Sequence, residues 1–369
     1  MRKGSAQNRM ENKKIYNGVI DWWKFVFCMV ILIMHVGEFF NEGFYLFEHG
    51  GYAVEFFFIV SGYFMCAHAM KRESPDGMKN IGREDIKFIA GKIKTVLPAY
   101  LYAWVLALGM YIYKTGLDIL KNDGIRAFVL KIVYALPNLL LLDMGGIKGT
   151  EVLGVSWYVS AMLIVMFITY PMLRKWGRNY CLIAAPVIAL LLSGFYSSRF
   201  GSYEGRYFWT GIMHHGLMRG FVSINIGCFA YAVSGFFKDK TDACGRFRRT
   251  LIRLAEPAAY ISAIALMHYG DDKALNIINI LLLIGVSVTM SGRSFFAGIC
   301  DNGVCRFMGR LSLWVYFCQS PARMFVLKKF PDCSYKRAFI LIFGLTALLT
   351  AVGMGVHALV AKRKNGGEI

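Results

Sequence analysis

Residues 19–40 read VIDWWKFVFCMVILIMHVGEFF. The run is almost wholly apolar and is long enough to cross a bilayer, whose hydrocarbon core needs about 20 such residues. Nine similar runs follow it, so the sequence predicts an all-α integral membrane protein, a bundle of about ten transmembrane helices. The predicted spans are 19–40, 52–70, 95–113, 155–173, 181–197, 212–235, 255–269, 275–292, 308–327 and 338–361.

The composition supports this class. Of 369 residues, 56% are apolar and only 18% are charged, whereas soluble domains carry about 25% charged residues. Disordered, collagen-like and disulfide-scaffold classes are therefore excluded. One apolar stretch, 125–142, is interrupted by Lys131 and Pro137 and is expected to be an interfacial or re-entrant segment.

The charge distribution predicts the orientation. The net charge is +19, and basic residues favour the cytoplasmic side of membrane proteins. With a cytoplasmic N-terminus, 26 Lys and Arg residues lie between spans on the cytoplasmic side and 12 on the outer side. Both termini are therefore expected in the cytoplasm. No nucleic-acid-binding motif accompanies the positive charge, so nucleic acid is not an expected partner.

The chain is expected to form one domain. Residues 1–14 form a basic cytoplasmic tail, 15–361 a single transmembrane domain, and 362–369 a short cytoplasmic tail. The first span is expected to be an uncleaved anchor, because the run is too long for a signal peptide. The nine cysteines include no CxxC pair, and no metal site is expected.

Ionisable residues in the first span are functional candidates, because charges inside a membrane are costly. Asp21, Lys24 and His35 share one helix face, and Glu38 follows His35 by three residues. Lys24 and His35 are separated by 11 residues, or about 16 Å along a helix. Two simpler interpretations stay open: Lys24 snorkels to lipid head groups, and His35 forms an interhelical hydrogen bond.

The second span opens with GGYAVEFFFIVSGYFM, residues 50–65. Glu55 lies near its outer end, where it is able to pair with His35 or Lys24 or simply to reach the interface. Ser61 and Gly62 lie at mid-span, where small residues allow helices to approach closely. Helix packing is therefore the simpler explanation for this pair.

The sixth span carries His214, His215 and Arg219. The histidines are expected near the outer face, either as interfacial residues or beside an incoming substrate. Adjacent residues do not share a helix face, which argues against a shared metal. Arg219 lies deeper and is expected to need a carboxylate partner, which the sequence does not identify.

These motifs resemble those of membrane acyltransferase family 3, the integral-membrane O-acyltransferases that modify bacterial surface glycans. The resemblance covers about residues 15–361. The matching motifs are Lys24-x10-His35, preceded by Asp21; Phe57-Phe58-Ile59-Val60-Ser61-Gly62; Lys92 and Lys94 before Pro98-Ala99-Tyr100; and Trp157-Tyr158-Val159-Ser160 with Tyr170-Pro171. Two positions depart from the family pattern: Thr95 replaces a second Arg, and Gln319 stands where many relatives have His.

The resemblance implies transfer of an acyl group, with acetyl expected, from cytoplasmic acyl-CoA to a hydroxyl of a cell-surface or exported carbohydrate. Lys24, Lys92 and Lys94 would bind the CoA phosphates. His35 would act as general base or carry the acyl group, with Glu38 or Glu55 orienting its ring. Residues expected to contact the acceptor are Ser61, Trp157, His214, His215 and Arg219.

The expected location is the bacterial cytoplasmic membrane, with the bilayer as partner and no tightly bound cofactor. The alternative is a polytopic transporter of a glycan or small metabolite. A transporter should contain repeated halves with interrupted helices. The sequence has no internal repeat, and the Lys24–His35 pair has no counterpart in its second half.

Overall fold

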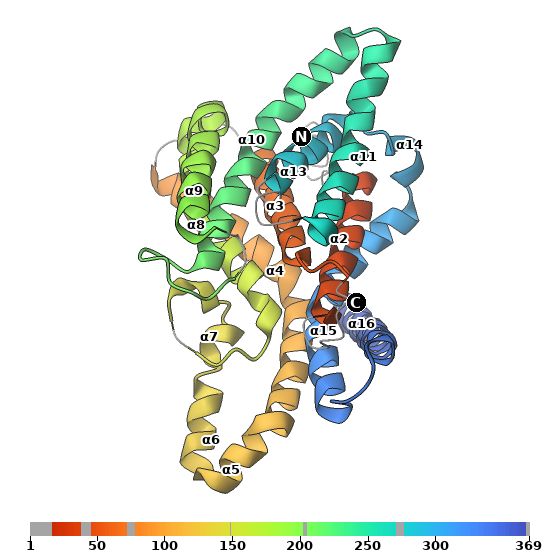
Figure 1. Cartoon of the computed structure of the whole chain (residues 1–369). Coiled ribbons are helices and arrows are strands. Elements are labelled where there is room, and N and C mark those ends of the chain that lie inside the picture. The colour runs from red at the N-terminus through yellow and green to blue at the C-terminus, as the bar shows by residue number, and fades with distance from the viewer. Residues whose placement is uncertain are drawn as a thin grey trace.

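A computed structural model describes residues 17–37, 46–71, 78–147, 149–201, 205–270 and 277–366. Helices are the regular elements of the described residues, which contain no β-strand (Figure 1). The helices are α2 (Gly18–Gly37), α3 (Ala53–Ala69), α4 (Met78–Tyr111), α5 (Leu117–Asn122), α6 (Gly124–Val133), α7 (Leu136–Leu139), α8 (Trp157–Asn179), α9 (Ala185–Phe200), α10 (His215–Ala243), α11 (Arg246–Tyr269), α13 (Ile278–Val288), α14 (Ala297–Cys300), α15 (Gly303–Lys329) and α16 (Tyr335–Gly366).

Seven helical segments among the described residues are long and apolar enough to cross a membrane, which confirms the predicted fold class. One of them, Gly154–Phe200, holds two predicted spans, and its backbone breaks at Gly177, where φ is 54° and ψ is −129°. Trp157 and Tyr196, near its two ends, both contact the His215–Gly216 end of α10, so the chain turns back between them. The total of ten crossings stays a prediction.

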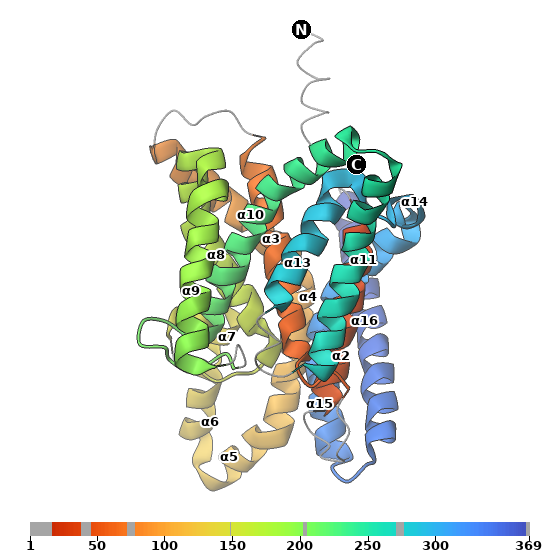
Figure 2. The ribbon, with the colours of Figure 1, turned by 45° about the horizontal axis from the view of Figure 1, so that its top comes forward.

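Two other predicted spans take a different form. The segment Ile278–Arg293 is apolar but shorter, and α15 carries Arg306, Arg310 and Arg323 within its length. The segment 125–142 forms α6 and α7. Figure 2 shows α5 and α6 at the opposite end of the molecule from the turn between α10 and α11.

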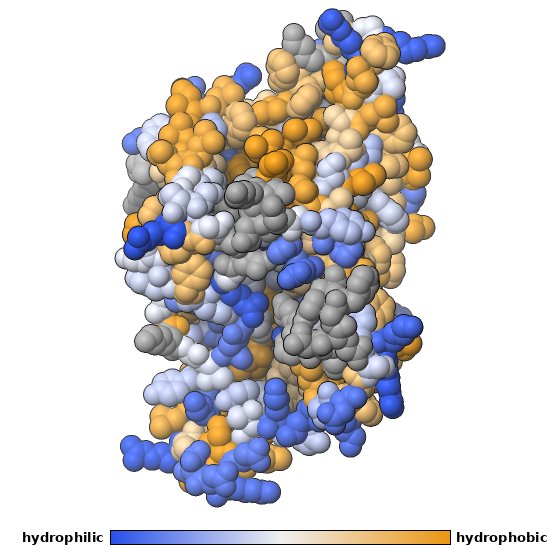
Figure 3. Space-filling model, in the orientation of Figure 1, coloured by the Kyte–Doolittle hydropathy of each residue, from blue (hydrophilic) through white to orange (hydrophobic). Residues whose placement is uncertain are grey.

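The surface matches a membrane protein. Hydrophilic residues gather at the tip over the α10–α11 turn and along the edge over α5 (Figure 3). The surface below that tip is largely hydrophobic, and the middle of this face mixes hydrophilic and hydrophobic residues. Exposed apolar side chains include Ile183, Leu190 and Leu191 of the α8–α9 segment. Apolar side chains on such a surface are stable where the surrounding solvent is lipid.

The centre of the bundle is the contact between α3 and α10. A Cβ atom added to Gly62 would lie 2.2 Å from the carbonyl oxygen of Ile224. A Cβ atom added to Gly227 would lie 2.1 Å from the carbonyl oxygen of Ile59. The two backbones therefore touch where each helix has a glycine, which supports the packing interpretation of Gly62.

Candidate functional site

A cavity of about 440 Å³ lies at the His35 end of α2. Its wall combines aromatic and charged side chains from elements far apart in the sequence. The residues that matter for its chemistry are His35, Tyr52, Trp157, Arg206, Arg219 and Tyr316. The exposed side chain of Glu48 also lines it.

His35 is almost wholly enclosed, with 7% of its surface exposed. Its Nδ1 atom is buried and completes no hydrogen bond within the described part of the chain. The Gln319 side chain of α15 lies within reach of the ring, and the positive charges of Arg206 and Arg323 act on it. The imidazole therefore lies between a polar cavity and a buried amide.

Arg219, which lines the cavity, forms a buried ion pair with Glu55. The Nε atom of Arg219 lies 2.6 Å from Oε1 of Glu55, and the Glu55 side chain is completely buried. Ser223 donates a hydrogen bond to the other carboxylate oxygen, and Arg219 Nη2 donates to the Gly51 carbonyl at 2.9 Å. Glu55 is thus the carboxylate partner that the sequence could not identify, and it pairs with neither His35 nor Lys24.

The guanidinium of Arg219 is also held by two aromatic rings. It lies 5.1 Å from the centre of the Trp157 ring and 5.9 Å from that of Tyr52. Because aromatic faces carry partial negative charge, both contacts stabilise the cation. The same two rings line the cavity, so the ion pair fixes part of its wall.

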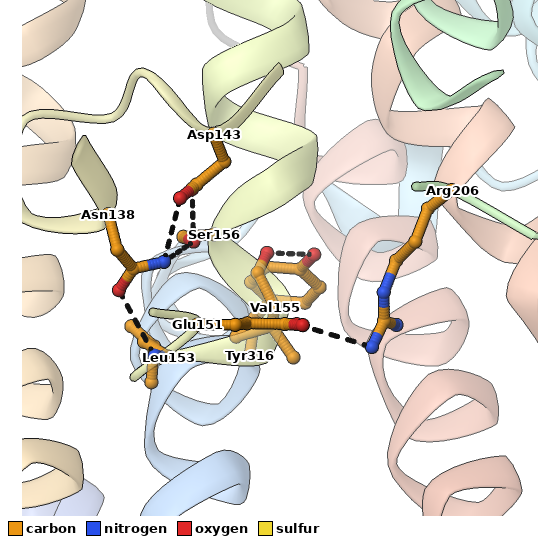
Figure 4. A network of polar contacts seen from close by, with 8 residues as sticks. All are labelled: Asn138, Asp143, Glu151, Leu153, Val155, Ser156, Arg206 and Tyr316. Atoms are coloured by element: carbon orange, nitrogen blue, oxygen red, sulfur yellow. Dashed lines mark hydrogen bonds and ion pairs between the residues drawn. The ribbon is translucent and has the colours of Figure 1, made fainter. Parts of the chain in front are cut away.

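One side of the cavity is built by the segment between α7 and α8, and Asn138 is the centre of its polar network (Figure 4). Asn138 Oδ1 accepts hydrogen bonds from Trp104 Nε1 and from the Leu153 backbone. Its Nδ2 donates to Asp143 and to Ser156, each at 2.9 Å. Burial raises the pKa of Asp143 above its usual value, against the effect of these hydrogen bonds.

The same segment contacts two side chains of the cavity wall, Tyr316 and Arg206. Tyr316 donates a hydrogen bond of 2.8 Å to the carbonyl of Val155, which follows Leu153 and also lines the cavity. Glu151, in the same segment, lies 3.4 Å from Arg206, and about a third of each side chain is exposed. Figure 4 shows this ion pair crossing from the α7–α8 segment to the chain before α10.

The predicted donor-binding lysines lie away from this cavity. Lys24 forms an ion pair with Asp21 at 3.0 Å and lies 5.5 Å from the centre of the Phe64 ring. Lys92 lies 5.4 Å from the Phe88 ring, and Lys94 is exposed. Lys24 and His35 therefore lie near opposite ends of α2.

Aromatic and hydroxyl side chains connect the two ends. Phe57, Ser61 and Phe64 follow one face of α3 at helical spacing, and each is partly exposed. The Ser61 hydroxyl lies 3.5 Å from that of Tyr158, and the Tyr158 ring lies 5.8 Å from Tyr316 in the cavity wall. We call Phe57, Ser61, Phe64, Tyr158 and Tyr316 the aromatic track; it runs from Lys24 to the cavity.

The two neighbouring histidines do not line the cavity. His215 is fully buried between Phe208 and Tyr196, with its Nδ1 2.8 Å from the Gly205 carbonyl. His214 Nδ1 lies 3.0 Å from the Tyr207 carbonyl. Both rings therefore hold the chain before α10, which carries Arg206 to the cavity. Glu38 lies outside the described residues.

Sequence inspection missed Arg206, Glu151, Asn138 and Tyr316. The first three belong to connections between predicted spans, where charged and polar residues are common. Tyr316 lies in an apolar span with many other aromatics. Only the proximity of these segments in the structure distinguishes the four residues from ordinary loop and core residues.

Comparison with known proteins identifies the family. No curated protein and no solved structure matches the chain. A family model described as an acyltransferase domain matches residues 17–358, which includes the cavity, the aromatic track and Lys24. The chain therefore belongs to acyltransferase family 3 and is a multi-pass membrane acyltransferase.

Proposed function

We propose that this acyltransferase moves an acyl group, with acetyl expected, from cytoplasmic acyl-CoA to a hydroxyl of a cell-surface or exported carbohydrate. The proposed location is the bacterial cytoplasmic membrane. One observation carries the proposal: His35 lines a polar and aromatic cavity on the helix that carries Lys24 three turns away. A catalytic base and a phosphate-binding cation are thereby separated along one axis.

The donor would enter from the Lys24 end. CoA carries phosphate groups, and the ammonium groups of Lys24, Lys92 and Lys94 provide positive charge there. The distance of about 16 Å between Lys24 and His35 requires a long, thin donor group to reach the cavity. The aromatic track supplies apolar surface along this distance and hydroxyl groups at Ser61 and Tyr158.

The acceptor would occupy the cavity. Carbohydrates combine apolar faces with many hydroxyl groups. Tyr52, Trp157 and Tyr316 offer aromatic surface, while Arg206 and Glu48 offer hydrogen-bonding groups. Ser61, one of the predicted acceptor contacts, belongs to the aromatic track and is assigned here to the donor.

In direct transfer, His35 accepts the proton of the acceptor hydroxyl while the hydroxyl oxygen attacks the thioester carbonyl carbon. The carbon–sulfur bond then breaks, the ester forms, and the proton passes to the CoA thiolate. In the alternative sequence, His35 attacks the thioester carbon and the carbon–sulfur bond breaks to release CoA thiolate. The hydroxyl oxygen then attacks the acyl-imidazole, the carbon–nitrogen bond breaks to free His35, and the hydroxyl proton passes to the thiolate. Both sequences require a free electron pair on the ring nitrogen that faces the cavity.

Substitution of His35 tests the proposal. With radiolabelled acetyl-CoA and purified protein, His35→Ala should lower the acyl-transfer rate by about 10²–10⁴, the usual contribution of a general base. His35→Gln should be nearly as inactive, because Gln forms hydrogen bonds but cannot accept the proton. His357→Ala is the matched control, since this imidazole is exposed on α16.

The outcomes separate the alternatives. If His35 only bridges helices, His35→Gln should keep most of the activity, and the proposed catalytic role would be wrong. Movement of a glycan across vesicles without acyl-CoA would favour the transporter. Expression level and thermal stability of each variant show whether the loss of activity reflects misfolding.

A further inference from the structure

Two buried polar atoms beside the cavity lack a hydrogen-bond partner among the described residues. They are Nδ1 of His35 and Oε1 of Gln319, and both are enclosed by protein. A buried polar atom without a hydrogen bond is destabilising. The two side chains are nevertheless hydrogen-bonding neighbours, so a small side-chain adjustment joins them.

The orientation of the Gln319 amide is determined by its second contact. Its Nε2 atom donates a hydrogen bond of 2.9 Å to the Tyr316 carbonyl. A flipped amide would place two oxygen atoms against each other at that position. The oxygen of Gln319 is therefore left toward the ring, where it is able only to accept a hydrogen bond.

This orientation decides which nitrogen of His35 carries the hydrogen. A neutral imidazole has one N–H donor and one acceptor nitrogen, and the partner of one nitrogen sets the state of the other. The Gln319 side chain and the Ile31 backbone lie within reach of the ring, and Nδ1 is the enclosed nitrogen. The Gln319 oxygen is an acceptor, and so is the carbonyl oxygen that a residue one turn earlier offers, so we assign the hydrogen to Nδ1. If Nδ1 carries the hydrogen, Nε2 keeps the electron pair.

We propose that Gln319 is a positioning residue that accepts a hydrogen bond from Nδ1 of His35 and leaves Nε2 free to react in the cavity. The inference rests on the proposed function, in which His35 is the catalytic residue. Gln319 would take the orienting role expected of Glu38 or Glu55. Glu55 is already paired with Arg219, and Glu38 lies outside the described residues.

The supporting contacts extend beyond this pair. Tyr316 presents its carbonyl to Gln319 and its hydroxyl to the Val155 carbonyl, so α15 is attached to the Asn138 network at the same position. The Gln319 amide is thus held by backbone atoms on one side and orients His35 on the other. A fixed ring orientation is what a general base or nucleophile requires.

Nitrogen-15 NMR of the histidine-labelled protein tests the tautomer directly. The His35 resonances are assigned by their loss in His35→Asn. The expected result at neutral pH is a protonated Nδ1 and an unprotonated Nε2. The opposite tautomer in the wild-type protein would overturn the proposal, and this measurement needs no Gln319 variant to fold.

Gln319→Met tests the kinetic role, because Met has similar length and lacks both amide atoms. It should lower kcat by about ten- to a hundredfold, the range for a hydrogen bond to a charging group. The KM for acyl-CoA should stay unchanged, because the substitution is remote from the lysines. Ser320→Ala, at the adjacent buried position, is the matched control and should keep wild-type kinetics.

Gln319→Glu supplies a pH readout that a structural role would not move. A carboxylate beside Nδ1 stabilises the imidazolium, so the acidic limb of the kcat profile should move to higher pH. The other charged or titratable groups around the ring, Arg206, Arg219, Arg323, Glu48, Tyr52 and Tyr316, are unchanged in this variant. An unmoved limb would contradict the proposal.

Failure of this inference is distinguishable from failure of the proposed function. If His35→Ala keeps acyl transfer, the proposed function is wrong. If His35→Ala is inactive while Gln319→Met keeps the wild-type kcat, only the role of Gln319 is wrong.

Discussion

The Nε atom of Arg219 lies 2.6 Å from Oε1 of Glu55, and this pair joins α10 to α3 at the wall of the cavity. Each charge has a further hydrogen-bond partner: Ser223 donates to the Glu55 carboxylate, and the Arg219 guanidinium donates to the Gly51 carbonyl. A buried charge is tolerated only when its hydrogen-bonding groups are satisfied. The pair therefore ties the central helix contact to the wall of the cavity.

Removing the charge of Glu55 should destabilise the protein. Glu55→Gln leaves the Arg219 charge buried without its counter-ion, which costs about 3–5 kcal/mol. A lowered midpoint of thermal unfolding in detergent is the expected result. The double variant Glu55→Leu, Arg219→Met should recover much of the loss, because no charge stays buried. A wild-type midpoint for Glu55→Gln would contradict the importance of the pair.

A side chain at Gly62 should separate α3 from α10. The Cβ of Gly62→Ala would meet a backbone oxygen at 2.2 Å, which cannot move without displacing the helix. We expect a loss of about 1–3 kcal/mol or more in stability. Gly109→Ala in α4 is the control: nothing lies within 4 Å of its added Cβ, so it should be neutral or slightly stabilising. Thermal unfolding and expression level provide the comparison.

The donor-binding role of the lysines predicts a specific kinetic change. Lys24→Ala and Lys92→Ala should each reduce kcat/KM for acyl-CoA by about ten- to a hundredfold, from a loss of about 1.5–3 kcal/mol per charged hydrogen bond. Lys121→Ala, an exposed position on α5 at the opposite end, should have no effect. Unchanged donor kinetics in the Lys24→Ala, Lys92→Ala double variant would exclude this role.

Asp143 should make stability depend on pH. Its pKa is raised in the folded chain, so its contribution to stability is complete below the unfolded value of about 3.9 and is lost as pH rises through the folded value. Asp143→Asn does not titrate. The stability of the wild type relative to this variant should therefore fall as pH rises above about 4. Thermal unfolding of both proteins across this pH range measures their relative stability. A wild type that gains stability relative to Asp143→Asn as pH rises would contradict the prediction.

The proposed orientation has a labelling test. On a background without the nine native cysteines, single cysteines at positions 80 and 245 should react only after the membrane is permeabilised. A cysteine at position 123, between α5 and α6, should react from outside. Reaction at position 80 or 245 in intact cells would reverse the orientation and the entry side of the donor.

The helical spans were predictable because each depends on local composition alone. A continuous apolar run such as 19–40 must form a helix in lipid, since its backbone groups have no water to bind. Prediction was weaker where helices carry charge or break. The α11 helix extends from Arg246, well before the predicted span at 255–269, and α15 carries three arginines within a membrane-length helix.

Three residues of the cavity wall, His35, Trp157 and Arg219, were among the candidates from the sequence. Lys24 and His35 share a helix face, and helical geometry alone predicts their separation. The partner of Arg219 was not predictable, because Glu55 is 164 residues away and other carboxylates were available. His214 and His215 had the right chemistry for substrate binding, yet their rings support the chain that carries Arg206.

The sequence by itself determined that this protein is a helical membrane protein of the acyltransferase family, because hydrophobic length and short motifs are local properties. Only the tertiary structure decided that Arg206, Tyr316 and Gln319 approach His35, and that Glu55 neutralises Arg219. These contacts join residues from separate helices and connections. Their geometry arises from how α2, α3, α10 and α15 pack, and packing depends on all the helices together rather than on any one segment.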